Sequence, residues 1–195
     1  MRGRAESLAA QRRLRNLTTV DIEFRRTGER RYAVLVHCAD QRTLQMDPAP
    51  GYDALMPHDL LHYAVECELG LQAGIFGQLA QGGHARLFHP VADASSGKRQ
   101  LARERRRGAR RDERIAHRED SAESEAAVHA YGEAWRRRAR DAKNTPVEPR
   151  FARLCSRLDG LSEQWRKLRV GESMTVCWPD TSLRRRAARP ALQQG

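Results

Sequence analysis

The sequence has no long hydrophobic run, and this absence bears on where the protein resides. No stretch of apolar residues approaches the roughly 20 that a bilayer-spanning helix needs. The first residues, MRGRAESLAAQRRLR, contain arginines but no apolar segment ahead of a cleavage site, so we do not expect secretion. The cysteines show no CxxC spacing: Cys38, Cys67, Cys155 and Cys177. They indicate reduced thiols, and we expect a cytoplasmic protein without a membrane span.

Lysine is nearly absent, and the positive charge is unevenly distributed. Only three of the 36 basic residues are lysines, a skew typical of a GC-rich coding sequence whatever the protein binds. Thr43 to Ala85 contains no Lys or Arg, yet holds five acidic residues. Lys98 to Arg111 carries eight basic residues and one Glu. The net charge of +11 therefore lies in the arms and a linker, whereas the central segment is acidic.

Several catalytic signatures are also missing. No nucleophile elbow surrounds a serine, no glycine-rich phosphate loop follows a predicted strand, and no internal repeat occurs. These absences argue against a serine hydrolase, a phosphate-loop nucleotide-binding protein and a repeat architecture.

Alternating apolar and polar residues predict a β-hairpin near the start of the chain. Val20, Ile22 and Phe24 face one way between polar neighbours, and a more apolar strand returns at 32–37 after a turn at Thr27 and Gly28. Close to the other end, GESMTVCWPD predicts a short strand. Because a lone hairpin is barely stable in water, we expect this strand to pair with the hairpin.

Helical patterns fill the rest of the predicted domain. We expect helices over 56–69, 72–81, about 121–142 and 151–168. The sum is an α+β fold, in which a small antiparallel sheet is packed with helices. We predict a basic N-terminal arm at 1–16 and a single domain at 17–178. A flexible basic linker at about 91–118 interrupts the domain, and a disordered basic tail follows at 179–195.

The segment MPHDLLHYAVECELGL puts imidazole and acidic side chains on one side of the first helix. At about 100° per residue, His62, Glu66 and Asp59 fall about 40°, 80° and 100° from His58. Such a group could coordinate one ion, and its ligand types suit Zn²⁺, Fe²⁺ or Mn²⁺. We therefore take His58 and His62 as candidate metal ligands. Asp59 and Glu66 are candidate catalytic residues, each as a ligand or a base.

Two other interpretations of this face stay open. An amphipathic helix needs a polar side, so the same residues are consistent with a solvated surface on which Asp59 only complements the helix dipole. In a non-catalytic interaction module, the acidic face, with Glu66 and Glu68, would bind a protein partner. Outside the helix, His84 and His89 could complete a metal site if the chain folds back.

The Arg-rich linker is the candidate nucleic-acid interface. Basic side chains release counterions from phosphates on binding. Such segments bind nucleic acid in some proteins and only solubilise in others. Nucleic-acid binding is therefore a further hypothesis, and its candidate residues are Arg105, Arg106, Arg107, Arg110 and Arg111.

The motif HDLLH, formed by His58, Asp59 and His62 with the two leucines between, resembles the HDxxH motif of the ubiquinone-biosynthesis accessory family. That motif is associated with zinc, so the resemblance implies a metal at the two histidines. The family carries a glutamate twelve residues beyond the second histidine, where this chain has Gly74. The similarity spans five residues and does not transfer an activity.

A longer part of the chain resembles a group of uncharacterised bacterial proteins. The shared features are the stretch MPHDLLHYAVECELGLQAGIFGQLAQGG, a variable linker, a helix end with Trp165, Leu168 and Gly171, and a strand that ends in Trp-Pro. This resemblance covers about half of the chain. It implies the domain layout given above and no known activity.

Overall fold

The fold is described from a computed structural model that covers most of the predicted domain. The predicted basic arm and disordered tail, at 1–16 and 179–195, lie outside the described residues. Within the described part of the chain, every helix is too short or too polar to cross a bilayer. The described ranges are 20–38, 41–92, 97–116, 119–141 and 149–178.

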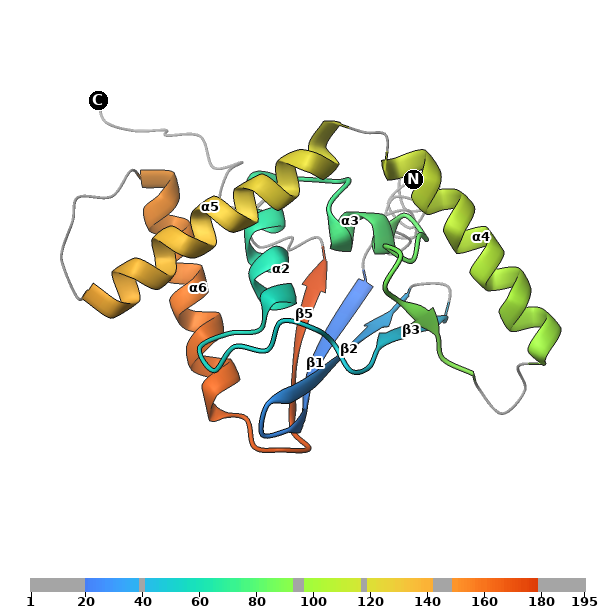
Figure 1. Ribbon diagram of the computed structural model, residues 1–195, viewed down its shortest axis with the longest axis horizontal. Coiled ribbons are helices and arrows are strands. Elements are labelled where there is room, and N and C mark those ends of the chain that lie inside the picture. The colour runs from blue at the N-terminus through green and yellow to red at the C-terminus, as the bar shows by residue number, and fades with distance from the viewer. Residues whose placement is uncertain (1–19, 39–40, 93–96, 117–118, 142–148, 179–195) are drawn as a thin grey trace, which may run out of the picture.

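The structure is an α+β fold built on one antiparallel sheet (Figure 1). Its strands lie in the order β4-β3-β2-β1-β5. The predicted hairpin and its pairing with the C-terminal strand are confirmed, whereas the two short strands β3 and β4 were not predicted. The strands are β1 (Val20–Gly28), β2 (Arg31–His37), β3 (Thr43–Met46), β4 (His89–Pro90) and β5 (Ser173–Trp178).

The apolar side of the sheet forms the base of the core. Ile22 of β1 pairs with Val36 of β2 on one side and with Val176 of β5 on the other. Ile22 and Phe24 are fully buried, as the period-2 pattern predicts for the inner face of a strand. The branched and aromatic side chains of neighbouring strands lie side by side on this face and form a continuous apolar surface, which the helices cover.

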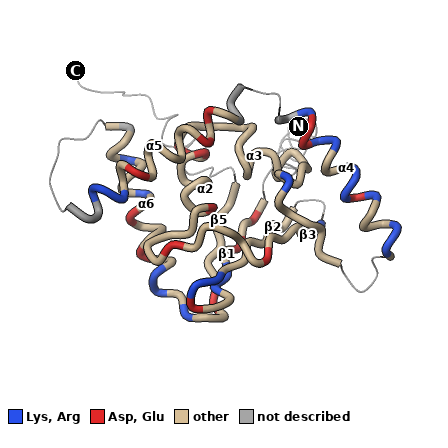
Figure 2. The backbone as a smooth tube through the Cα atoms, viewed as in Figure 1, with Lys and Arg blue, Asp and Glu red and all other residues tan. Residues whose placement is uncertain are grey.

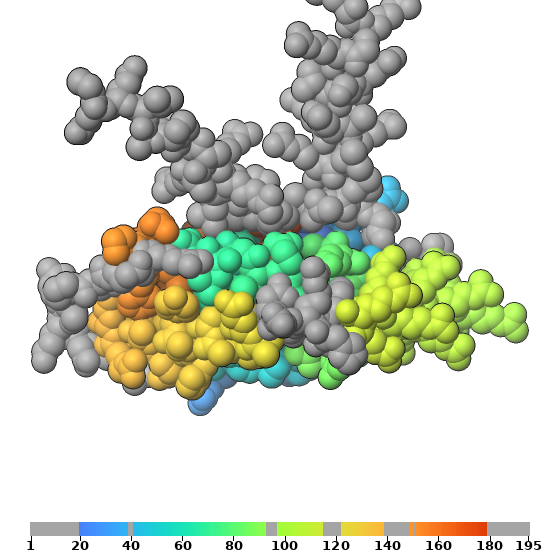
Figure 3. Space-filling model, turned by 90° about the horizontal axis from the view of Figure 1, so that it is seen from above, coloured from blue at the N-terminus to red at the C-terminus, as the bar shows by residue number. Residues whose placement is uncertain are grey.

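Helix α2 (His58–Leu69) lies between the sheet and the other helices. The α3 (Ile75–Ala80), α5 (Glu119–Asp141) and α6 (Pro149–Lys167) helices all contact it. Figure 3 shows α5 on the outer side of α2, and the sheet lies on the opposite side. Because other elements cover α2, its polar residues Asp59, His62 and Glu66 are buried along with most of its apolar ones.

The ends of α2 follow from local sequence. Pro57 precedes the first helical residue, where its missing N–H costs no hydrogen bond. Gly70 ends the helix in the left-handed conformation (φ 72°), and its N–H and that of Leu71 both donate to the Glu66 carbonyl oxygen. Gly70 is therefore the C-cap, and the helix begins two residues later than the predicted Met56.

Helix α4 (Lys98–Ala116) shows that the prediction of a flexible linker over about 91–118 was wrong for most of that segment. Arg, Ala, Leu and Glu are strong helix formers, so the segment does not need a wide apolar stripe to become helical. The less exposed residues recur at three or four residues, which defines one narrow docked face: Leu101, Glu104, Gly108 and Asp112.

A buried carboxylate, Asp112, holds α4 on the domain. Its Oδ1 accepts the backbone N–H groups of His84 (2.7 Å) and Ala85 (3.0 Å). Its Oδ2 accepts the N–H of Arg86 (3.1 Å). One turn earlier, Gly108 lies so close to the His84 ring that a Cβ there would overlap it. The loop after α3 is thereby bound to α4 by three hydrogen bonds to one charge.

We expect Asp112→Ala to loosen α4, because three backbone N–H groups, that of His84 buried and the other two partly buried, lose their acceptor. The free energy of unfolding should fall by about 1–3 kcal/mol. The amides of 98–116 should also exchange faster with solvent. Glu113→Ala is the matched control, since it removes the neighbouring exposed carboxylate and should change stability by less than about 0.5 kcal/mol. Urea unfolding and hydrogen–deuterium exchange measure both effects. Equal protection of α4 in the two variants would contradict this docking.

Candidate metal centre

The two histidines of HDLLH meet at the start of α2. The Nε2 atoms of His58 and His62 lie 3.1 Å apart, and the rings are nearly perpendicular at 84°. His62 is 1% exposed, whereas His58 is partly exposed. The site is therefore closed on the side of His62 and accessible from solvent on the side of His58.

A carboxylate from α5 joins the pair. Glu125 Oε2 lies 3.8 Å from His62 Nε2, and one ligand atom from each of His58, His62 and Glu125 falls within 4.8 Å of the others. The Glu125 side chain is largely exposed, so it lies on the solvent side of the group. Sequence analysis missed this residue because 63 positions separate it from His62.

One signal could have identified Glu125. The predicted helix of about 121–142 has an apolar stripe that includes Val128 and Trp135, both buried in the structure. Glu125 precedes Val128 by three residues and so falls on the same side of the helix. A carboxylate in line with the stripe that packs against α2 is a candidate partner for the polar residues of that helix.

The Glu66 carboxylate sits on the other edge of the His62 ring. Its Oε1 lies 3.3 Å from His62 Nδ1 and accepts the backbone N–H of Ile75 (2.8 Å) and the hydroxyl of Ser124 (2.9 Å). Its Oε2 accepts the N–H of Phe76 (3.1 Å). Glu66 is fully buried. When the Glu66 carboxylate accepts the Nδ1–H of a neutral His62, the Nε2 atom of His62 carries the lone pair, and this atom faces His58.

The two imidazoles have opposite electrostatic surroundings. Burial lowers the pKa of His58, and the neighbouring His62 lowers it further. For His62, burial also lowers the pKa, but the hydrogen bond to Glu66 and its negative charge outweigh this effect, so the pKa is raised. Two Nε2 atoms at 3.1 Å cannot both carry a proton. The space between the two Nε2 atoms therefore holds at most one cation, either a proton or a metal ion.

Asp59 points away from this group. The hydroxyl of Tyr32 contacts both Asp59 Oδ2, at 2.5 Å, and the carbonyl oxygen of Pro50. The tyrosine has one proton to donate, so a protonated Asp59 fits the arrangement, and burial raises the pKa of Asp59 in that direction. Asp59 thus links the start of α2 to β2 and to the loop before the helix.

The polar side of α2 is not a solvated surface. Asp59, His62 and Glu66 are all at most 3% exposed. Residues of α3 and α5 contact Glu66, a residue of α5 lies beside His62, and Tyr32 of β2 contacts Asp59. Of the two acidic residues named in the protein-interaction hypothesis, Glu66 is thus buried. Glu68, the other residue of that hypothesis, contacts Arg153 of α6 at 3.3 Å and has a side chain only 8% exposed.

The remaining candidates lie elsewhere. His84 is buried against α4, and neither His84 nor His89 belongs to the metal-competent group found among the described residues. All five predicted nucleic-acid-binding arginines lie exposed on α4. Figure 2 shows basic residues along this helix, at one end of the molecule. Of these, Arg111 donates to the Gly82 carbonyl oxygen at 3.3 Å and belongs to the docked side.

The chemistry of the group must be inferred from its own geometry, since no family model, no curated protein and no solved structure matches this chain. Two imidazoles and one carboxylate, with a second carboxylate oriented behind one ring, form a donor set for a divalent transition metal. Three protein ligands leave coordination positions for water.

The close approach of Gly74 to Glu66 yields a prediction about stability. A Cβ at position 74 would overlap the Glu66 carboxylate, although the backbone there is extended and accepts any residue. We expect Gly74→Ala to lower the free energy of unfolding by about 1–3 kcal/mol, because the carboxylate must leave its donors. Urea unfolding measures this loss.

Gly160→Ala in α6 is the control, since nothing lies within 4 Å of the added methyl group. In the interior of a helix this change should stabilise the protein by up to about 1 kcal/mol. If both variants behaved alike, the tight contact at Gly74 would be refuted.

Proposed function

We propose that the protein binds one divalent transition-metal ion through His58 Nε2, His62 Nε2 and the carboxylate of Glu125. The observation that carries this proposal is the 3.1 Å between the two Nε2 atoms. Metal–nitrogen bonds of about 2.0–2.1 Å place two imidazole nitrogens about 3.3 Å apart at a tetrahedral angle and about 2.9 Å apart at a right angle. The observed spacing falls between these values.

The surroundings of His62 support the same assignment. A histidine ligand usually donates its second ring N–H to a carboxylate, which fixes the ring and raises its basicity. Glu66 is placed to accept from Nδ1, and its three other donors hold the carboxylate in position. In this proposal Glu66 is a positioning residue, and Asp59 anchors the beginning of the helix.

The similarity of HDLLH to a zinc-associated motif also favours a metal. The position at which that motif's family carries a glutamate is Gly74 here, and the Glu66 carboxylate lies directly against it. The donor set of two imidazoles and one carboxylate suits Zn²⁺, Fe²⁺ or Mn²⁺. A bound ion of this kind would polarise a water molecule in an open position and supply a nucleophile near neutral pH.

The competing explanation is a direct hydrogen bond between two neutral imidazoles, which has the same nitrogen–nitrogen distance. Metal binding separates the two explanations. The purified chain, stripped with a chelator and titrated with Zn²⁺, Fe²⁺ and Mn²⁺, should take up one equivalent of at least one ion. Uptake can be measured by calorimetry and by elemental analysis.

We expect His58→Ala and Glu125→Ala to weaken metal affinity by at least about tenfold, and Glu66→Gln by about 10–100-fold through the orientation of His62. His129→Ala is the matched control, because it removes an exposed histidine from the same helix as Glu125. It should keep the affinity of the unchanged chain. Failure of the unchanged chain to bind any of the three ions, or equal binding by the His58→Ala variant, would refute the proposal.

A further inference from the structure

The outer side of α4 carries a line of arginines that the metal site does not use. Five of them follow one another at steps of four, four, three and four residues, so they share one side of the helix within about 80°. They extend over about 22 Å of helix axis. All are exposed, and together we call them the α4 ridge: Arg99, Arg103, Arg107, Arg110 and Arg114.

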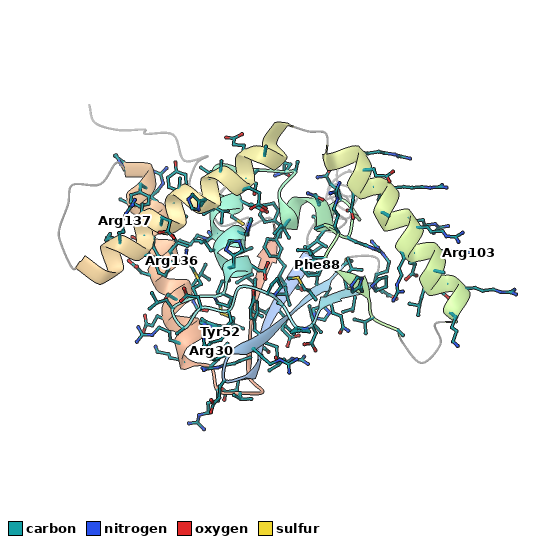
Figure 4. All side chains as sticks on the ribbon, in the orientation of Figure 1. Arg30, Tyr52, Phe88, Arg103, Arg136 and Arg137 are labelled. Carbon is teal, nitrogen blue, oxygen red and sulfur yellow. The ribbon has the colours of Figure 1, made fainter. Side chains whose placement is uncertain are left out.

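The α4 ridge faces away from the body of the protein. The docked face of α4, with Gly108 and Asp112, lies on the opposite side of the helix. Figure 4 shows Arg103 extending outwards from α4, and Figure 1 shows the helix at one end of the molecule. Because the buried carboxylate of Asp112 fixes the helix, the ridge is an ordered array of charges.

The ridge arginines differ from the arginines of the other helices. Arg136 lies 3.5 Å from Asp53, Arg138 lies 3.1 Å from Asp159, and an arginine of α6 pairs with α2. Across the described ranges, no ridge arginine makes an ion pair or a side-chain hydrogen bond. Like charges at i and i+4 destabilise a helix by a few tenths of a kcal/mol per pair. Dissolved salt screens part of this repulsion, and a bound polyanion would relieve it further.

We propose that the α4 ridge binds the phosphate backbone of duplex nucleic acid without reading its sequence. A duplex carries one negative charge per about 1.7 Å of axis, so a straight row of guanidinium groups meets phosphates along its whole length. Guanidinium groups suit phosphate recognition because each presents a planar set of donors. This binding site is separate from the metal centre and does not depend on it.

The composition of α4 favours a duplex over the other polyanions. Proteins that bind single strands stack bases on aromatic side chains, and α4 has no aromatic residue. Helices that bind membrane surfaces insert an apolar face, whereas Leu101 lies on the docked side of α4 and the outer side is charged. The helix offers one amide side chain, Gln100, so base recognition has little support.

The test is fluorescence anisotropy with the full chain and a labelled duplex of about 20 base pairs of arbitrary sequence, at salt concentrations from about 50 to 200 mM. With five phosphate contacts, the slope of log K against log salt should be about −4.5. The variant Arg103→Gln/Arg107→Gln/Arg110→Gln should be shallower by about 2.7 and bind at least about thirtyfold more weakly near 100 mM salt. Glutamine is a good helix former, so α4 should persist, which circular dichroism checks.

The matched control is Arg30→Gln/Arg31→Gln/Arg166→Gln, which removes the same charge from exposed positions outside α4. It should keep the slope within about 1 of the unchanged chain. Equal loss in both variants, or no binding by the unchanged chain, would overturn the proposal. Tighter binding of a single-stranded probe would overturn it as well. So would equal ridge-dependent binding to phosphatidylserine vesicles, which would assign the ridge to a membrane surface.

Discussion

The buried carboxylate of Glu66 is the interaction on which the arrangement of the helices depends. Taking an ionised carboxylate out of water costs several kcal/mol unless its oxygens are satisfied. Here the donors come from two other helices, namely the N–H groups of Ile75 and Phe76 at the start of α3 and the hydroxyl of Ser124 on α5. Removing α3 or α5 would leave this buried carboxyl group with fewer donors, so α2, α3 and α5 are coupled through one side chain.

The same carboxylate couples the fold to the proposed site. Ser124 sets the register of α5 on α2, and this register puts Glu125 beside the histidine pair. The remaining hydrogen bond of Glu66 fixes the His62 ring and its tautomer. Since a ligand that binds only the folded state stabilises it, an ion held by this group would strengthen the contact between α2 and α5. Stability and metal affinity should therefore change together wherever a substitution moves α5.

Sequence patterns predicted the parts of the fold that depend on local periodicity. The hairpin, the C-terminal strand and the helices at α2 and α6 follow from period-2 and period-3.6 patterns with clear caps, such as Gly70. Side-chain angles on a helix also placed His58, His62 and Glu66 together, as the structure has them, but they included Asp59, which contacts Tyr32 instead. They could not show that α5 covers this face, because burial depends on a contact between segments far apart in the chain. For that reason the role of Glu66 towards α3 could not be predicted, and Glu125 could be identified only through its place in line with the apolar stripe of its own helix.

Helix α4 shows why a charged segment is a poor indicator of flexibility. Its apolar content is too low for a conventional core-facing stripe, yet its intrinsic helix propensity is high and one buried carboxylate, Asp112, replaces hydrophobic docking. The difference matters for binding, because a flexible arginine linker must lose conformational entropy when its charges align on a polyanion. A helix that is already docked has lost that entropy on folding. The spacing of its arginines is then fixed by the helix geometry. The array lies on α4 at one end of the molecule and the histidine pair on α2 in its middle, so we expect that each site can be altered without disturbing the other.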